Sequence, residues 1–319
     1  MTKTATLPRP LRGIVPPMLT PITDRDTLDV PGLERLVEHI LEGGPAGLFI
    51  LGTTGEGPSL SYRMRHELID RVAEQVAGRV PLLVGITDTA FVESVEVADY
   101  AADAGAQAVV LALPPYFPTG QRDLARYVEQ IAAELPLPVF LYNMPSHTKL
   151  TFEPETVARL MELPNVVGLK DSSANMIYFH RLRELAADRP DFSLLIGPEE
   201  LLAEALLLGA HGGVSGGANL APRLYVNLYR AATDRDLDRV AELHARVMRI
   251  SGAIYTVDRH GSGVIKGLKC ALSTLGICSD RVAEPLERLA PAERELIRER
   301  LGRLEFLRDT KRLRLRPMP

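Results

Sequence analysis

Val166-Val167-Gly168-Leu169-Lys170-Asp171 is an apolar stretch that ends in two charged residues. An uninterrupted apolar run of this length is typical of a parallel strand that is buried on both faces. Burial favours the neutral form of a lysine at the end of such a strand, and a neutral amine is a nucleophile toward carbonyl carbon. The alternative is a lysine that reaches solvent or pairs with Asp171. The choice between the two depends on the rest of the chain.

Short apolar runs alternate with longer amphipathic segments along most of the 319 residues. Apolar runs predict strands at 13–19, 47–51, 81–86, 108–113, 138–141, 166–171, 193–196 and 212–214. Helical periodicity predicts helices at about 30–43, 60–78, 91–104, 121–134, 153–162, 175–188, 199–209 and 222–232. Strict alternation predicts a parallel sheet covered by helices, and eight units predict a closed (β/α)₈ TIM barrel, an α/β fold.

A doubly wound sheet is the alternative fold, but the glycine pairs at 212–213 and 216–217 lack the G-x-G-x-x-G spacing, and no Walker sequence occurs. Three further helical stretches are expected at about 235–252, 261–276 and 291–306. We therefore expect a catalytic barrel domain at 10–232, a C-terminal three-helix extension at 233–310 and a tail at 311–319.

Composition narrows the class of protein. A net charge of −4 and a pI near 6.0 argue against nucleic acid or an anionic membrane as a partner. The sequence has no apolar run long enough to span a membrane and no secretory signal, and its two cysteines, Cys270 and Cys278, have no histidine cluster beside them. We expect a cytoplasmic protein with no metal and no cofactor. Only six of the 37 basic residues are lysines, so a lysine at a strand end is informative, because arginine cannot do amine chemistry.

In a TIM barrel the chemistry takes place at the carboxyl ends of the strands. Hydroxyl and amide groups gather there around one lysine: Thr20, Thr53-Thr54-Gly55-Glu56, Tyr116, Tyr142-Asn143, Lys170-Asp171, Gly197 and Ser215-Gly216-Gly217. A carbonyl attacked by an amine gains and loses protons at least twice, which requires a hydroxyl relay. A small anionic substrate needs backbone N–H groups and hydroxyls, which a Thr-Thr-Gly turn supplies. The set therefore favours Schiff-base chemistry on a small keto acid.

Three segments carry a resemblance to a known family: Gly52-Thr53-Thr54-Gly55-Glu56, Tyr142-Asn143-Met144-Pro145 and Gly168-Leu169-Lys170-Asp171. In this order and spacing they resemble the signature segments of the dihydrodipicolinate synthase / N-acetylneuraminate lyase family of class I, pyruvate-dependent aldolases. The resemblance extends from about Gly13 to the C-terminal helices. It is specific to the superfamily and much less specific to one member.

The resemblance implies roles for individual residues. Lys170 would form the imine with pyruvate, and Tyr142 would be the general acid and base beside it. Thr53 would pass protons toward solvent, and Tyr116 would complete this relay from across a subunit interface. The implied assembly is a homotetramer built as a dimer of dimers.

The resemblance also implies a substrate-binding set. Thr54 and the backbone amides of its turn, including that of Gly55, would hold the pyruvate carboxylate. The other residues expected to line the site are His147, Gly197, Val214 and Ser215.

Structural alternatives stand beside these roles. Tyr142 is alternatively a core tyrosine at the barrel rim, and Tyr116, among prolines, alternatively shapes a loop. The pair Thr53-Thr54 is alternatively a helix cap, although Ser59 and Ser61 lie closer to that helix. For Glu56 we expect a structural role, with its carboxylate tying down the loop.

The sequence departs from the synthase branch at one position. There an arginine two residues after the proline of the tyrosine motif clamps the carboxylate of aspartate semialdehyde, whereas this chain has His147. A neutral imidazole lacks the bidentate fork of arginine, and Lys149 is expected to point to solvent. The glycine-rich loop at 214–219 leaves room for a longer, hydroxylated acceptor.

The leading hypothesis is therefore an aldolase that cleaves or forms a 2-keto-4-hydroxy acid, with pyruvate as one partner and an aldehyde as the other. The segment at 52–61 resembles aldolases for 2-keto-3-deoxy sugar acids, and the segment at 261–276 resembles 4-hydroxy-2-oxoglutarate aldolases. The alternative within the class is a 4-hydroxy-tetrahydrodipicolinate (dihydrodipicolinate) synthase that condenses pyruvate with aspartate semialdehyde. More remote alternatives are a non-catalytic barrel that binds a keto acid and a phosphate-binding barrel enzyme.

Overall fold

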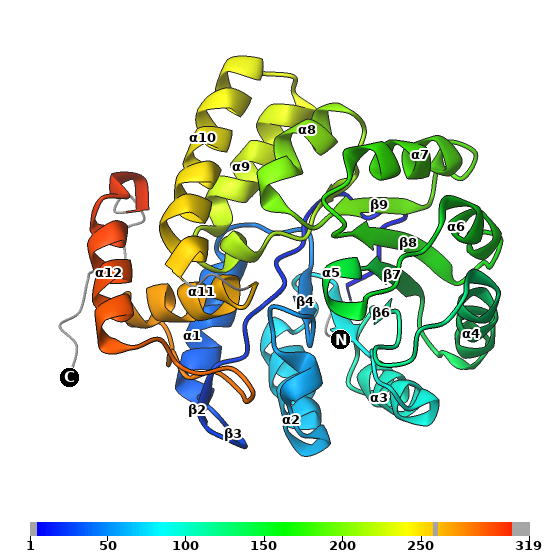
Figure 1. Ribbon diagram of the computed structural model, residues 1–319, viewed down its shortest axis with the longest axis horizontal. Helices are drawn as coiled ribbons and strands as arrows, with labels where there is room; N and C mark the ends of the chain where they lie inside the picture. The colour runs from blue at the N-terminus through cyan, green and yellow to red at the C-terminus, as the bar shows by residue number, and fades with distance from the viewer. Residues whose placement is uncertain (1–4, 258–260, 308–319) are drawn as a thin grey trace.

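A computed structural model describes residues 5–257 and 261–307 of the chain (Figure 1). Its main sheet has eight parallel strands in the order β1-β10-β9-β8-β7-β6-β5-β4. The strands are β1 (Gly13–Ile14), β4 (Leu48–Ile50), β5 (Leu82–Gly85), β6 (Ala108–Ala112), β7 (Val139–Asn143), β8 (Val166–Asp171), β9 (Ser193–Ile196) and β10 (Gly212–Gly213). The predicted TIM barrel is confirmed.

The barrel closes between the segment after β1 and β4. Pro17 and Phe49 form a parallel bridge, the Phe49 N–H donates to the Pro16 carbonyl at 3.0 Å, and the Met18 N–H donates to the Phe49 carbonyl at 2.7 Å. The first strand is shorter than the predicted 13–19, because Pro16 and Pro17 have no N–H to donate. The Pro16 carbonyl and the Met18 N–H still form backbone hydrogen bonds with β4 and close the barrel.

The helices between the strands follow the predicted pattern. They are α1 (Val30–Leu41), α2 (Tyr62–Val76), α3 (Phe91–Asp103), α4 (Gln121–Glu134), α6 (Pro154–Leu160), α7 (Met176–Ala186), α8 (Leu202–Leu207) and α9 (Pro222–Thr233). Asp29, Ser61 and Asn175 cap α1, α2 and α7, with each side chain accepting from a backbone N–H of the first turn. Capping by Ser61 leaves Thr53 and Thr54 free of that task.

A short hairpin and a single α-helical turn are among the features that lie outside the predicted elements. A hairpin of β2 (Ile22–Asp24) and β3 (Thr27–Leu28) precedes α1, and a single helical turn, α5 (Pro145–Thr148), follows β7. Segments of two to four residues are too short to show a hydrophobic period, so the sequence pattern gave no sign of them.

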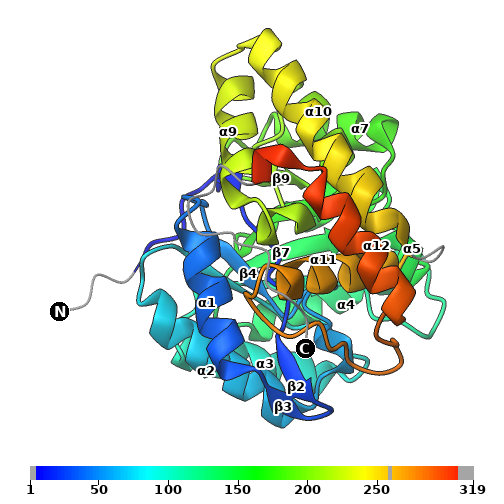
Figure 2. The ribbon, with the colours of Figure 1, turned by 90° about the vertical axis from the view of Figure 1, so that its left-hand side faces the viewer.

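The predicted C-terminal helices form α10 (Leu237–Ile254), α11 (Gly263–Thr274) and α12 (Pro291–Gly302). Figures 1 and 2 show them together on one side of the barrel. The three-helix extension is therefore confirmed, whereas the domain boundaries at 232 and 310 stay predictions. The expected tail at 311–319 lies outside the described residues.

Two apolar clusters separate the inside of the barrel from its outer layer. The outer cluster packs the strands against the helices and includes Leu169. The inner cluster fills the barrel and includes Phe49, Tyr142 and Leu195. Because side chains alternate along a strand, Lys170 faces the inside, directly after outward-facing Leu169. The fold thus delivers the predicted lysine to the interior of the barrel mouth. Within the described ranges, no helix is long and apolar enough to cross a membrane.

Candidate active site

Lys170 is the buried amine at the carboxyl end of β8. It is 6% exposed and pairs in register with Tyr142 of β7 and Leu195 of β9. Its Nζ lies 4.0 Å from the centroid of the Tyr142 ring and 5.5 Å from that of the Phe49 ring. The amine therefore contacts aromatic faces, which hold a cation or a neutral amine without forming an ion pair.

Asp171 does not pair with Lys170, although the two residues are adjacent. Its fully buried carboxylate accepts from Asn143 Nδ2 at 2.9 Å, from the Ser173 N–H at 3.0 Å and from Ser173 Oγ at 2.9 Å. Burial raises the pKa of Asp171, and these hydrogen bonds oppose the rise. Over the ranges 5–257 and 261–307, no ion pair involves Lys170, so the structural alternative of a Lys170–Asp171 pair is wrong.

Tyr142 places its hydroxyl group beside the amine. It is buried, and its OH lies 3.3 Å from Thr53 Oγ1. Burial alone would raise the pKa of Tyr142, but the charge of Lys170 and hydrogen bonds from Thr53, Lys170 and Ser172 outweigh it, so the pKa is lowered. A phenol with a lowered pKa beside an amine is suited to proton transfer.

The turn after β4 presents Thr53, Thr54 and Gly55 to the same mouth of the barrel. The Glu56 N–H donates to the Thr53 carbonyl at 3.0 Å, and Thr20 Oγ1 donates to the Gly55 carbonyl at 2.7 Å. Gly55 is buried, and a Cβ added to it would lie 2.8 Å from the Met18 carbonyl oxygen. The turn is closely packed, and its half-buried threonines keep access to the site.

Glu56 fixes this turn through its side chain. Its Oε2 accepts from the Ala283 N–H at 2.7 Å, and its Oε1 lies 2.5 Å from Lys269 Nζ. Both side chains of the pair are buried. The predicted structural role of Glu56 is confirmed.

His147 lies in α5, beside the mouth of the barrel. It is exposed, and its Nδ1 lies 3.0 Å from Ser146 Oγ. Partial desolvation lowers the pKa of His147, and the charges of Lys149 and Lys170 lower it further. The exposed Lys149 donates to the Ser146 carbonyl at 2.7 Å instead of reaching toward the site.

The other predicted binding residues lie directly after β9 and β10. Half-buried Gly197 follows β9 and donates its N–H to the Asp171 carbonyl at 2.7 Å. Val214 belongs to the inner cluster. Ser215 is fully buried, and its Oγ has no hydrogen-bond partner among the described residues. This hydroxyl lies on the side of Gly213 that faces Leu202 of α8.

Tyr116 is the one predicted catalytic residue that this chain does not bring to Lys170. Its side chain is 85% exposed, its φ is 93°, and its ring packs edge-on against Phe117 at 5.0 Å. No hydrogen bond joins it to Thr53 or Tyr142 within the described residues. An exposed aromatic pair of this kind leaves the Tyr116 hydroxyl free for contacts outside the chain.

Sequence reasoning missed two residues of the site. Ser172 contributes a hydrogen bond that lowers the pKa of Tyr142, and a Cβ added to Gly197 would lie 1.9 Å from Ser172 Oγ. Its position directly after Lys170-Asp171 was the available signal. Phe49, whose ring lies near the amine, sits inside an apolar run and gives no such signal.

A buried carboxylate, Glu199, supports the loop after β10. It accepts from the Gly217 N–H at 2.7 Å, from Tyr255 OH at 2.7 Å and from Tyr225 OH. Burial raises the pKa of Glu199 to about 7, against the opposing effect of these hydrogen bonds.

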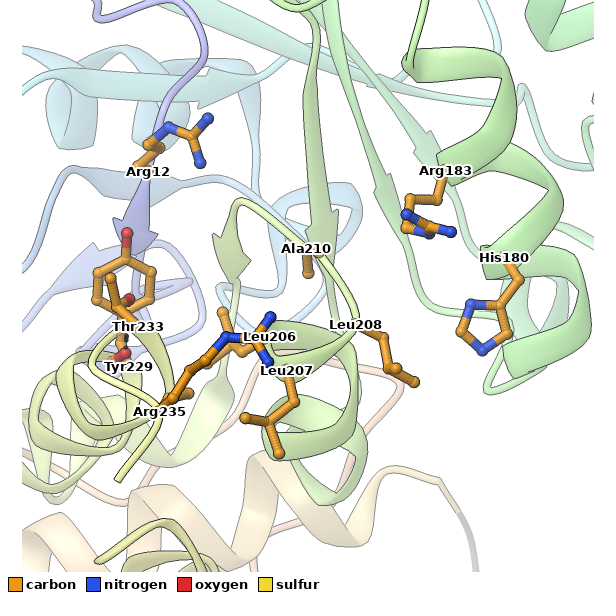
Figure 3. A pocket seen from close by; sticks show the side chains of 12 residues that line it. Arg12, His180, Arg183, Leu206, Leu207, Leu208, Ala210, Tyr229, Thr233 and Arg235 are labelled. Carbon is orange, nitrogen blue, oxygen red and sulfur yellow. Dashed lines mark hydrogen bonds between the residues drawn. The ribbon is translucent and has the colours of Figure 1, made fainter. Parts of the chain in front are cut away.

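The opposite end of the barrel carries a separate hollow of about 530 Å³ (Figure 3). It is lined by residues before β1 and β10, by the middle of α7 and by the carboxyl ends of α8 and α9. Its charged side chains are those of Arg12, Arg183 and Arg235. None of the predicted site residues lines it. In the described part of the chain, no group of three or more His, Cys, Asp or Glu side chains is arranged to hold a metal ion.

A closed (β/α)₈ barrel with a buried lysine, a tyrosine and a threonine at the carboxyl ends of its strands has the arrangement of a class I aldolase. The model of the dihydrodipicolinate synthetase family matches residues 10–303. The chain belongs to this family and is a carbon–carbon lyase of the class I aldolase type.

Named relatives and solved structures agree with this assignment. The chain is 33% identical to the 4-hydroxy-tetrahydrodipicolinate synthase of Methanopyrus kandleri over 93% of its own length and 97% of the relative's. It is 35% identical to the enzyme of the same name from Thermomicrobium roseum, over 97% and 98% of the two chains.

Among solved structures, the dihydrodipicolinate synthase of Bacteroides thetaiotaomicron is 55% identical, with a TM-score of 0.90 and coverage of 92% of this chain and 99% of that one. YagE of Escherichia coli K12, a prophage protein of the dihydrodipicolinic acid synthase family solved in complex with pyruvate, is 31% identical. Its TM-score is 0.87, with coverage of 92% and 98%.

Proposed function

We propose that this protein condenses pyruvate with aspartate semialdehyde, as a 4-hydroxy-tetrahydrodipicolinate synthase, through an imine on Lys170. The observation that carries the proposal is the contact of the Lys170 amine with Tyr142, whose OH lies 3.3 Å from Thr53 Oγ1. The names of the full-length relatives support the synthase, which was the alternative in the sequence analysis, over the leading hypothesis of a 2-keto-4-hydroxy acid aldolase.

The first half of the reaction forms the imine. The neutral Lys170 amine attacks C2 of pyruvate, and the carbonyl oxygen becomes the hydroxyl of a carbinolamine. Tyr142 gives this hydroxyl a proton, water leaves, and the C=N bond forms. This step leaves Tyr142 as a phenolate beside the protonated imine, and its lowered pKa suits Tyr142 to both directions of transfer.

The second half of the reaction forms the carbon–carbon bond. The Tyr142 phenolate takes a proton from C3 of the imine, which gives an enamine. C3 of the enamine then attacks the aldehyde carbon of the semialdehyde, and the new alkoxide takes the proton from Tyr142. Water then adds to the imine and loses a proton to Tyr142 through Thr53, and the carbinolamine collapses to release the product and the free Lys170 amine. The amine, the phenol and the threonine thus account for each proton that the chemistry moves.

The remaining site residues hold the substrates. We assign the pyruvate carboxylate to Thr54 and the backbone amide of Gly55, because a turn of this kind supplies N–H donors without a competing charge. Gly197 and Val214 would line the site near the imine, and the absence of a side chain at Gly197 leaves room for Ser172 Oγ. Ser215 would contact the substrates only through its backbone, because its hydroxyl lies toward Leu202.

Tyr116 enters the proposal through assembly. Its exposed ring suits it to complete the proton relay of a neighbouring subunit in a homotetramer arranged as a dimer of dimers. In that arrangement the Tyr116 hydroxyl approaches the Thr53 of its neighbour. A Tyr116→Phe variant would then lose activity without losing its fold.

A second candidate function is cleavage of a 2-keto-4-hydroxy acid to pyruvate and an aldehyde. The observation that favours it is His147, an exposed histidine with a lowered pKa at the position where the synthases carry a carboxylate-clamping arginine. A neutral imidazole holds a carboxylate weakly compared with a guanidinium.

One experiment separates the two candidates. The purified enzyme is given pyruvate with aspartate semialdehyde, and pyruvate consumption is followed; in parallel it is given 2-keto-4-hydroxy acids, and released pyruvate is detected with lactate dehydrogenase. The proposal predicts the higher kcat/KM in the first assay, and Lys170→Met is the inactive control. A higher kcat/KM with a hydroxy acid would support the second candidate, and activity retained by Lys170→Met would refute both.

A further inference from the structure

The C-terminal helices place a charge beside the turn that carries Thr53 and Thr54. Lys269 lies in α11 and is 0% exposed. Its Nζ lies 2.5 Å from Glu56 Oε1 and donates to the Arg281 carbonyl at 2.6 Å. Figures 1 and 2 show α11 next to α12, on the side of the barrel that carries α1. The buried amine of Lys269, from the C-terminal extension, thus pairs with Glu56 at the end of the turn that carries Thr53 and Thr54.

The backbone of Glu56 shows why the turn needs such an anchor. Its φ of 56° and ψ of 24° place it in the left-handed region, which a non-glycine residue seldom adopts without support from its surroundings. The Glu56 N–H closes the turn on the Thr53 carbonyl. Its side chain binds Lys269 through one oxygen and the Ala283 N–H through the other. The conformation that presents the threonines therefore depends on contacts made by the C-terminal segment.

The C-terminal segment is in turn fixed to the barrel at a second point. The Ser279 N–H donates at 2.8 Å to Asp29, the residue whose carboxylate also caps α1. Asp280, which is buried, pairs with Arg294 at 2.8 Å and with Arg288 at 2.5 Å. The segment that carries the partners of Glu56 is thus fixed at points that do not contact Glu56 itself.

We propose that Glu56 and Lys269 are positioning residues for pyruvate: their ion pair makes the C-terminal helices part of the machinery that sets the carboxylate-binding turn. The inference rests on the proposed function, because it assumes that Thr54 and the turn amides hold the pyruvate carboxylate. Neither residue touches substrate. Their effect passes through the backbone from Glu56 to Thr53 and Thr54.

The test uses the intact chain and measures imine formation with pyruvate alone. Enzyme is incubated with graded pyruvate and reduced with borohydride, and the adduct on Lys170 is quantified by peptide mass spectrometry. The double variant Glu56→Gln/Lys269→Met removes both charges, so that no unpaired charge is left buried. Its glutamine keeps an acceptor for the Ala283 N–H. We expect its half-saturating pyruvate concentration to rise about tenfold, equivalent to about 1.4 kcal/mol, with little change in the maximal adduct.

Asp280→Asn is the matched control. It weakens a buried ion-pair group of the same segment without touching Glu56, so it should lower the melting temperature by about 5 to 10 °C and leave half-saturation unchanged. Glu56→Gln alone should shift half-saturation in the same direction as the double variant. A role limited to stability would move the melting temperature of all three variants and the pyruvate dependence of none.

The outcomes separate the two proposals. No adduct in the wild-type enzyme would refute the proposed function itself. A wild-type adduct with unchanged half-saturation in either folded Glu56 variant would overturn the positioning role. An equal rise in Asp280→Asn would also overturn it, because general loosening of the C-terminal segment would then explain the loss.

Discussion

Two buried lysines of this protein have opposite surroundings. Lys269, in α11, is 0% exposed and meets the carboxylate of Glu56 and a backbone carbonyl. Lys170, at the end of β8, is 6% exposed and lies against the rings of Tyr142 and Phe49, while the adjacent Asp171 bonds elsewhere. Burial is nearly the same, so burial alone does not distinguish a structural amine from a reactive one. The distinction lies in whether a carboxylate fixes the charge.

The local contacts explain how each surrounding is kept. Asp171 is turned away from Lys170 by Asn143 and by Ser173, which together give its carboxylate three hydrogen bonds. At Lys269 the segment at 281–283 supplies a carbonyl to the amine and an N–H to its partner. The contacts of Asp171 therefore leave Lys170 without an ion pair, whereas the contacts at 281–283 support the ion pair of Lys269 with Glu56.

The largest expected effect is on activity. Lys170→Met should lower kcat by at least about 10⁴-fold, because it removes the nucleophile, whereas Lys269→Met should keep a measurable fraction of kcat in the part of the sample that remains folded. Pyruvate consumption measures both. A Lys170→Met enzyme that kept more than about one per cent of kcat would break the comparison.

The same two substitutions should have opposite effects on stability. Lys269→Met leaves Glu56 as an uncompensated buried charge and should lower the free energy of unfolding by about 3–5 kcal/mol. Lys170→Met replaces a buried amine that makes no ion pair among the described residues with an apolar side chain. It should leave the free energy of unfolding unchanged or raise it by about 1 kcal/mol. Urea denaturation at neutral pH gives both free energies of unfolding. Equal losses of this free energy in the two variants would contradict the assignment of an ion pair to Lys269 alone among these two lysines.

Tyr142→Phe tests the role of the hydroxyl group beside Lys170. The ring beside Lys170 is kept and the hydroxyl is lost, so kcat should fall about 10²-fold through the missing proton transfer, with little change in stability. Steady-state kinetics and a melting curve test this. Thr53→Val should act in the same direction, and a normal kcat for Tyr142→Phe would assign the proton transfer to another group.

Glu199 extends the comparison to a buried carboxylate, which makes no ion pair among the residues at 5–257 and 261–307. Its folded-state pKa is raised to about 7 from an ordinary value of 4.5. Between pH 4.5 and about 7 the folded protein keeps a proton on Glu199 that the unfolded chain releases. The stabilisation that comes from this proton is therefore fully present below pH 4.5 and is lost as the pH rises through about 7. The loss approaches about 1.4 kcal/mol per pH unit.

Glu199→Gln should flatten this pH dependence, since an amide does not titrate. Urea denaturation of both proteins across the same pH range provides the measurement. Parallel curves for the wild type and the variant would assign the dependence to other groups.

The smallest expected effect concerns the second substrate. His147→Arg supplies the bidentate carboxylate clamp and should raise kcat/KM with aspartate semialdehyde about tenfold while leaving the pyruvate dependence unaltered. Ser146→Arg is a matched control, because it adds the same charge one position away. An equal gain in the control would mean that charge, rather than the position of His147, sets the preference.

The parts of this comparison that the sequence predicted are local ones. Lys170, Tyr142 and the Thr53-Thr54 turn each follow an apolar run directly, so strand order alone brings them to one end of the barrel. The pairing of Glu56 with Lys269 joins residues far apart in the chain, and no local pattern indicates it. The rotation of Asp171 away from Lys170 depends on hydrogen bonds from the neighbouring strand and turn. The short β1 and the hairpin before α1 depend on proline positions and on elements too small to show a period.

The most direct test of the central claim is to locate the covalent adduct. Wild-type enzyme is reduced with borohydride in the presence of pyruvate and digested, and all lysine-containing peptides are examined by mass spectrometry. We predict a single reduced-pyruvate adduct, on Lys170, and unmodified Lys269. An adduct on another lysine, or an enzyme that stays unmodified at saturating pyruvate, would contradict the assignment of the reactive amine.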